Sequence, residues 1–187
     1  MLSGTLIVGS AAAVAAGTTG QTAEAATAAK WESRQLHFSY VGTTAHYSCD
    51  GLREQIKAIL QRLGASADLV VKASGCVRLA GPEPFPGVEA TFSVLESAGA
   101  DQAAAGSKDV TARWDKVTLD SDVPGRTGAG QCELIEQVKK QVLPLFTTRN
   151  LSYSDQCSPH SESLSGARLS VEVLRPVKSP PAEPTSP

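Results

Sequence analysis

The stretch CDGLREQIKAILQRLG, residues 49–64, sets a cysteine at the start of an amphipathic helix. Its apolar residues recur at the spacing of three and four that places them on one helical face. Asp50 is predicted to cap the first turn. Gly64 is predicted to stop the helix, because glycine tolerates the left-handed conformation that commonly follows a helix. The apolar face consists of Leu52, Ile56, Ile59, Leu60 and Leu63.

A second stretch of this kind, CELIEQVKKQVLPLF, covers residues 132–146. It again begins with a cysteine and continues as an amphipathic helix. Pro144 lacks the N–H that a helix interior needs, so the helix is predicted to end or kink near Leu143. Its apolar face consists of Leu134, Val138, Val142 and Leu145.

Two strands are predicted from the alternation of apolar and polar residues. GVEATFSVL begins at Gly87 and GARLSVEVL begins at Gly166, and each has one apolar face. This alternation is typical of half-buried strands whose apolar face is covered by helices. Further strands are predicted in RQLHFSYV from Arg34 and DKVTLDS from Asp115, and shorter ones in ADLVVKAS (67–74) and NLSYSD (150–155).

This order of elements occurs twice, which indicates an internal duplication. Each time a strand leads to a cysteine and a helix, and then to a short strand, a second cysteine and a strand that opens on glycine. Matching points lie 79 to 83 residues apart. The sequence therefore predicts an α+β fold of two tandem, disulfide-stapled βαββ repeats, with an antiparallel or mixed sheet and helices packed on one face. The repeats span residues 30–96 and 113–175, and a flexible linker at 97–112 joins them.

The four cysteines are predicted to form one disulfide inside each repeat, Cys49–Cys76 and Cys132–Cys157. The cysteines of each pair lie 27 and 25 positions apart, which leaves none of the close pairs that zinc sites usually contain. Four cysteines allow three pairings, and the duplication favours the pairing within repeats. Each such disulfide is expected to contribute about 3–4 kcal/mol by the chain-entropy model.

Residues 1–29 resemble a secretory signal peptide, with the apolar run LIVGSAAAVAAG and small residues at the spacing of a cleavage site. Cleavage after Ala25, Ala28 or Ala29 fits this interpretation. No Lys or Arg precedes Lys30, so a disordered Ala-rich segment is the alternative. Together with the even cysteine count, the leader predicts a bacterial protein exported to the periplasm or the extracellular space. Residues 176–187 are predicted to be a disordered Pro-rich tail.

The overall charge and hydropathy exclude some partner classes. The net charge is -2, and phosphate backbones require clusters of Lys and Arg, so no nucleic-acid partner is predicted. The same charge argues against electrostatic docking to anionic membranes. No apolar run reaches the length that spans a bilayer, so no membrane span is predicted.

A glycine-rich stretch before the second helix contains Gly125, Gly128 and Gly130. A strand, such a loop and a helix start are the context of a phosphate-binding loop, but the lysine followed by Ser or Thr is absent. The stretch is therefore interpreted as a flexible turn, and no cofactor is predicted.

Three histidines, His37, His46 and His160, are the first candidates for a metal site. His46 precedes Cys49 by three residues and His160 follows Cys157 by three, in different repeats. No acidic pair is spaced with either, so exposed histidines are favoured over metal ligands.

No catalytic constellation is found in the sequence. There is no G-x-S-x-G motif, and paired cysteines leave no thiol as a nucleophile. The carboxylates at the two helix starts are explained by the positive end of the helix dipole. They are Asp50, Glu54, Glu133 and Glu136.

Phe85 is the candidate contact residue, because it lies in the stiff loop PEPFPG, which is predicted to be exposed. The alternative is that Phe85 packs onto the core as a lid. The sequence favours an exported, non-catalytic binding or structural module whose partner is an envelope protein or a wall component. The alternatives are an exported enzyme with an unrecognised hydrolytic site, and a carrier of a small ligand or metal. No motif points to a named family, and the oligomeric state is left open.

Overall fold

The computed structural model describes residues 26–43, 45–77, 81–97, 110–120, 130–155 and 166–177, without the side chains of residues 130 and 131. The described residues form an α+β fold, as predicted, with two α-helices and one six-stranded antiparallel sheet. The first half contains β1 (Thr27–Ser39), α1 (Cys49–Arg62), β2 (Val70–Ser74) and β3 (Gly87–Ser97). The second half contains β4 (Val110–Asp120), α2 (Gly130–Gln141), the 3-10 turn η1 (Leu143–Leu145), β5 (Thr148–Ser154) and β6 (Arg168–Pro176).

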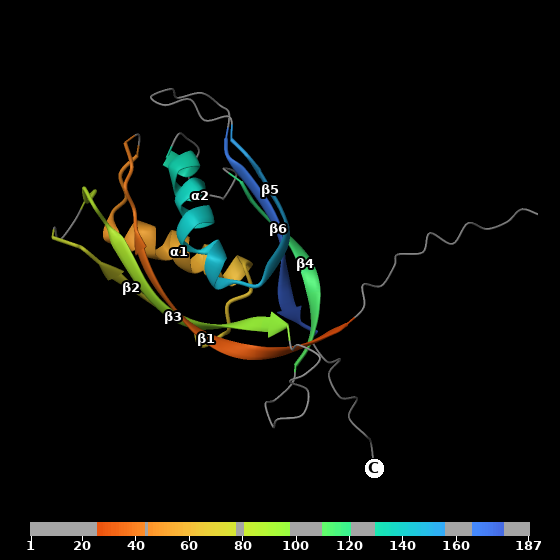
Figure 1. The fold of residues 1–187 in the computed structure, drawn as a ribbon. Helices are drawn as coiled ribbons and strands as arrows, with labels where there is room; N and C mark the ends of the chain where they lie inside the picture. The colour runs from red at the N-terminus through yellow and green to blue at the C-terminus, as the bar shows by residue number, and fades with distance from the viewer. Residues whose placement is uncertain are drawn as a thin grey trace, which may run out of the picture.

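The strand order across the sheet is β2-β3-β1-β4-β6-β5. Each half therefore contributes three neighbouring strands, and the halves meet where β1 pairs with β4. The described pairing between these two strands is short, and joins Thr27–Ala29 to Val110–Ala112. The sheet curves strongly, and both helices lie on its concave side (Figure 1). This arrangement confirms the prediction that the helices pack on one face of an antiparallel sheet.

The main core lies between the helices and the concave face of the sheet. The predicted apolar faces of both helices are buried in it, except that Leu145 lies in the 3-10 turn and is only partly buried, and the alternating residues of β3 and β6 are buried there as well. Phe92 of β3 stacks on Phe146 of the second half, with ring centroids 5.6 Å apart. One continuous core therefore holds the two halves together.

A second, smaller apolar cluster lies at the junction of the halves. It contains Ala29, Leu95, Ala112 and Leu174, all nearly inaccessible to solvent, with Val110 and Trp114 packed against it. Successive side chains of a strand point to opposite faces, and these residues have the opposite parity to the core residues of the same strands. The cluster therefore lies on the face of the sheet that points away from the helices.

The helix side of this junction is charged instead of apolar. Lys30 and Glu32 form an ion pair of 2.7 Å, and Arg34 pairs with Glu96. These side chains have the parity of Leu36, which lies in the main core further along β1. The apolar face of β1 thus changes sides along its length.

The final residues of β1 and the segment after it are bonded to helix α2. Three side chains spaced four residues apart on α2 reach the backbone of three alternate residues. The two spacings agree, because four residues of a helix span about 6 Å along its axis and two residues of a strand span about 6.7 Å. We call these contacts the ladder. Gln141 bonds Ser39 N at 3.1 Å and O at 3.0 Å, Gln137 bonds Val41 N at 3.0 Å and O at 2.7 Å, and Glu133 accepts from Thr43 N at 3.0 Å.

The helix ends differ in part from the predictions. Ser48, and not Asp50, is the N-cap of α1, because its hydroxyl accepts the Gly51 N–H at 3.1 Å. Gly64 follows the helix with a φ of 94°, as its predicted role as a stop requires. Helix α2 ends at Gln141, and Pro144 lies in the 3-10 turn that follows.

Four strands extend past the predicted boundaries of the units, and one of them, β3, ends at Ser97, the first residue of the predicted linker. Strand β1 begins at Thr27, inside the predicted leader, and β4 begins at Val110, inside the predicted linker. Strand β6 ends at Pro176, where the tail was expected to start. Apart from Ala26 and Val177, the rest of the predicted leader, linker and tail lies outside the described residues. Within the described residues, no helix is both long and apolar enough to cross a membrane.

Candidate functional site

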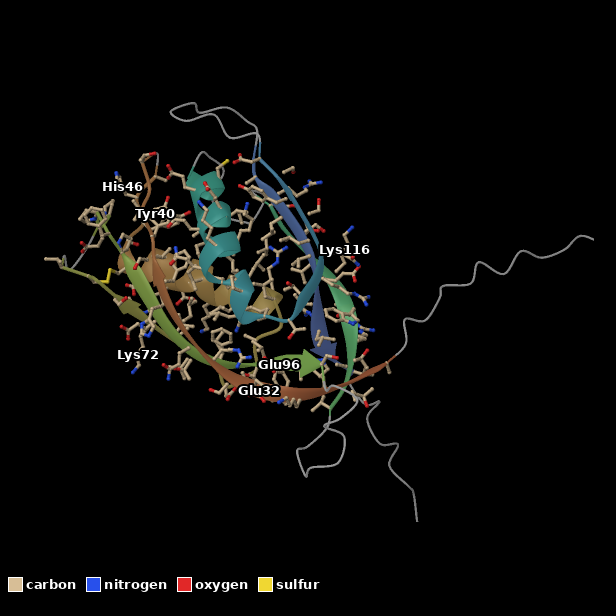
Figure 2. The ribbon with its side chains drawn as sticks, viewed as in Figure 1. Glu32, Tyr40, His46, Lys72, Glu96 and Lys116 are labelled. Atoms are coloured by element: carbon tan, nitrogen blue, oxygen red, sulfur yellow. A yellow bond between two sulfur atoms is a disulfide. The ribbon has the colours of Figure 1, made fainter. Side chains whose placement is uncertain are left out.

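Residues 75–77 and 81–86, which we call the tip, belong to the connection between β2 and β3. Gly75 turns the chain with a φ of 66°, which glycine adopts without strain. Cys76 follows and is bonded to Cys49, the first residue of α1. The predicted Cys49–Cys76 disulfide is thus present, and it ties the tip to the start of a helix. Its yellow bond marks this end of the molecule in Figure 2.

Backbone contacts hold the returning part of the tip in place. The Glu83 N–H donates to Tyr47 O at 3.0 Å, and Pro82 forms an isolated β-bridge with Ser48. At the start of β3, the Tyr40 N–H donates to Pro86 O at 3.0 Å. The tip is therefore fixed on the segment between β1 and α1 and, through the disulfide, on α1 itself.

Two apolar side chains of the tip remain in solvent. Phe85 is 69% exposed and Val77 is 88% exposed, although Glu83 and Pro86 beside them are buried. Phe85 therefore does not cover the core as a lid. Val77 was not predicted, because a single valine after a cysteine shows no periodicity that distinguishes a buried from an exposed position.

Only one cysteine of the second predicted disulfide lies within the described residues. Cys132 lies in the first turn of α2, is buried, and is disulfide-bonded. Its predicted partner, Cys157, lies outside the described residues, so the pairing Cys132–Cys157 stays a prediction.

Comparisons with known proteins give no family for the chain. No protein-family model, curated protein or solved structure matches it. Its function therefore has to be inferred from the chemistry of the described residues.

The histidines are not brought together by the described part of the chain. His37 is exposed on β1, on the face away from the helices, with Nδ1 3.9 Å from Glu89 Oε1. His46 is exposed on the segment before α1, and His160 lies outside the described residues. Among described residues, no group of three or more His, Cys, Asp or Glu side chains is placed to hold a metal ion.

A shallow hollow of about 220 Å³ lies on the outer face of the first half. Across its floor, His37, Glu89 and Lys72 occupy directly opposed positions on β1, β3 and β2. The central carboxylate is flanked by two basic side chains, so charge is largely balanced within the row. The remaining lining residues are Gln35, Leu36, Val70, Ala90 and Thr91.

Glu133 is the helix-start carboxylate with the most contacts. Its Oε1 accepts from Thr43 Oγ1 at 2.6 Å as well as from Thr43 N, and its Oε2 accepts from Tyr40 Oη at 3.0 Å. Burial of Tyr40, followed by the nearby Glu133 carboxylate, raises the pKa of the phenol. These bonds give Glu133 a structural role, as the sequence predicted for helix-start carboxylates in general.

The other three carboxylates at helix starts also have partners on their own helices. Asp50 and Glu54 both pair with Arg53, at 2.9 and 3.0 Å, and Glu136 pairs with Lys140 at 2.5 Å. Of the glycines tested as a phosphate loop, Gly130 begins α2, while Gly125 and Gly128 lie outside the described residues.

Proposed function

We propose that the chain is a non-catalytic binding module and that a protein partner docks on the tip. The observation that carries this proposal is the exposure of Phe85 and Val77 on a connection fixed by a disulfide and by backbone hydrogen bonds. Exposed apolar side chains that cluster at one place are typical of interaction sites. A fixed tip loses little conformational freedom on binding, so its contacts convert efficiently into affinity.

The proposed compartment is the bacterial envelope or the extracellular space. The leader-like residues that precede β1 and the Cys49–Cys76 disulfide support this location, since stable disulfides belong to oxidising compartments. The partner is accordingly proposed to be an envelope protein. A wall component in its place is one outcome of the experiment below.

Phe85→Ala is expected to lower recovery of the partner about tenfold or more, as removal of an aromatic anchor does at other interfaces. The tagged mature protein is used as bait in a non-reducing extract of the native envelope, and bound species are quantified by mass spectrometry. The bait spectrum also shows whether the leader has been removed.

Leu151→Ala is the matched control, because Leu151 is another exposed apolar residue, at 52%, on the opposite edge strand β5. This variant should retain the partner. A stoichiometric partner that Phe85→Ala retains would place the binding site elsewhere. A bait that retains only wall material would replace the protein partner, and a bait that retains nothing would argue against a binding module.

We also propose that the two βαββ units arose by duplication, as the sequence predicted, with two further matches between their strands. A shift of 81 residues, which matches Arg34 with Asp115, agrees with the sheet register, because Arg34 lies opposite Phe92 and Asp115 lies opposite Val173. A shift of 83 residues aligns AKWE, residues 29–32, with ARWD, residues 112–115, and a shift of 79 aligns Leu95 with Leu174. Both shifts agree with the register, because Trp31 lies opposite Leu95 and Trp114 lies opposite Leu174.

Ion pairs and strand pairing, as well as residue identities, support this alignment. The ion pair Lys30–Glu32 at 2.7 Å has its counterpart in Arg113–Asp115 at 3.0 Å. The β1–β4 pairing is also unchanged when the halves are exchanged, because Thr27 pairs with Ala112 and Ala29 pairs with Val110. These relations are those of a local two-fold axis between β1 and β4.

The duplication predicts that a circular permutant folds with the original linker. Ser97 and Pro176 are equivalent ends and Thr27 and Val110 are equivalent starts, so residues 98–109 should also join Pro176 to Thr27. A chain that starts at Val110 and ends at Ser97 is expected to match the circular dichroism of residues 26–177. Its melting temperature should differ by only a few degrees, about the effect of 1 kcal/mol.

The matched control shortens the linker to four residues in both chains. Equivalent ends should make the two chains lose the same stability. A permutant that does not fold with the full linker, or a loss confined to one chain, would contradict the proposed symmetry.

The tip has a polar counterpart in the proposed second repeat. The residues that follow Cys157 read SPHSESLS and contain no aromatic residue, whereas the tip contains Phe85. Under the duplication, only the first repeat presents an aromatic anchor at this place. The proposed binding site is therefore single, although the fold is proposed to be duplicated.

A further inference from the structure

The two residues of the Cys49–Cys76 disulfide differ in solvent exposure. Cys76 is an exposed residue of the tip, while Cys49 is partly buried as the first residue of α1. A thiolate attacks a disulfide sulfur directly, so access decides in part which sulfur is attacked. Exposure therefore favours attack at Cys76 Sγ.

The position of Cys49 favours its departure as a thiolate. A thiol at a helix N-terminus has a lowered pKa, because the unpaired N–H groups and the helix dipole favour negative charge. A thiol of lower pKa leaves faster in thiol–disulfide exchange. Asp50 beside it opposes this effect, but its carboxylate is paired with Arg53 Nη1 at 2.9 Å.

The exposed side of Cys76 presents no described carboxylate to an incoming thiolate. Val77 and Phe85 are exposed and apolar, and Glu83, the acidic residue among the described tip residues, is 2% exposed. Access and leaving-group chemistry thus act in the same direction.

We propose that Cys76 is a thiol-exchange site. A thiolate reductant attacks Cys76 Sγ, the Cys49–Cys76 bond breaks, and its electron pair leaves with Cys49 as a thiolate. The product is a mixed disulfide between Cys76 and the reductant. With a dithiol, the second thiol then displaces Cys76 and the reductant leaves as its own disulfide, so two electrons reduce one bond. This inference does not depend on the proposed binding partner.

Contacts that do not involve the sulfurs allow the Cys49–Cys76 bond to form again. The Glu83–Tyr47 and Tyr40–Pro86 hydrogen bonds and the Ser48–Pro82 bridge do not involve the sulfurs. These contacts keep the tip beside the start of α1 after the bond has opened. The Cys49 thiolate can then attack the mixed disulfide at Cys76 and expel the reductant.

The first test maps the mixed disulfide that glutathione forms with the native oxidised chain. Sub-stoichiometric exchange is quenched with acid, free thiols are alkylated, and trypsin separates Cys49, on residues 35–53, from Cys76, on residues 73–78. Glutathione is expected on Cys76 over Cys49 by about tenfold or more. Equal labelling, an excess on Cys49, or no adduct at either cysteine would overturn the proposal.

The same chain in concentrated guanidinium chloride is the matched control. Unfolding removes the helix and the difference in exposure, so the ratio should fall to within about twofold of one. A ratio that stays at its native value would show that neighbouring residues, and not the fold, direct the attack, and would also overturn the proposal.

The second test follows the fold through one cycle. Opening with dithiothreitol should leave the far-ultraviolet circular dichroism of the helices unchanged, and removal of the dithiol in air should restore the Cys49–Cys76 peptide pair. Loss of the helical signal together with bond opening, or scrambled pairs on reoxidation, would overturn reversible exchange at this site.

Discussion

Phe92→Ala is expected to lower the free energy of unfolding by about 3–5 kcal/mol, the cost of removing a large buried aromatic side chain. Phe92 is 1% exposed and stacks on Phe146 across the two halves. Its removal therefore leaves a cavity where the halves share their core. Because they share that core, the variant should still unfold in one transition.

Guanidinium unfolding, followed by circular dichroism and by tryptophan fluorescence, measures this change. Phe85→Ala is the matched control, since the same residue type is 69% exposed there and should cost less than about 0.5 kcal/mol. A loss below about 1 kcal/mol for Phe92→Ala would contradict the shared core. A stable Phe85→Ala chain also validates that variant for the binding experiment.

Replacing Cys49 and Cys76 together with serine is expected to cost about 3.5 kcal/mol, because the disulfide closes a loop between residues 27 positions apart. The loss arises mainly in the unfolded chain, which gains conformations when the loop opens. The double variant should keep the native circular dichroism under non-denaturing conditions.

The midpoint and slope of guanidinium unfolding separate this effect from a change in the native state. The unfolded variant is less compact, so the slope should rise along with the fall in midpoint. The Cys49→Ser single variant, which leaves Cys76 free, should match the double variant under reducing conditions. A double variant within about 1 kcal/mol of the parent would contradict the expected effect of this disulfide on the unfolded chain.

The helices and the strands β3 and β6 could be predicted from their periodicity. Their buried residues stay on one face up to the last residue of each predicted stretch, Leu95 or Leu174, as in Val88, Ala90 and Phe92. Hydrophobic alternation is then sufficient to assign a strand, and the stripe of α1 is sufficient to assign a helix. The predicted Cys49–Cys76 pairing depended on the same element order.

The first half of β1, from Thr27 to Ser33, could not be found in this way, because the apolar face of the strand changes sides. Ala29 is buried on the outer face, whereas Leu36 is buried on the helix side. Between them, Lys30 and Glu32 point to the helix side and satisfy each other as an ion pair. This part of the sequence therefore resembles an Ala-rich leader followed by a polar segment, and the predicted start of the strand, Arg34, lies after the observed start, Thr27.

The contacts of the tip were only partly predictable. The prolines around Phe85 indicate an exposed loop, and the exposure of its ring agrees with that prediction. The exposure of Val77 depends on how β2 ends against the start of α1, which is a tertiary contact. The ladder was missed because Gln137 and Gln141 are typical of a solvated helix face.

The hydrogen bonds of the ladder also join two segments that are synthesised at different times. Ser39, Val41 and Thr43 are bonded by residues 102, 96 and 90 positions later in the chain. A chain that emerges at about 5–20 residues per second exposes this segment for roughly 5–20 s before α2 is complete. Unpaired strand backbone invites pairing with other chains. The fold therefore carries a period of vulnerability during synthesis, which ends only when the second helix arrives.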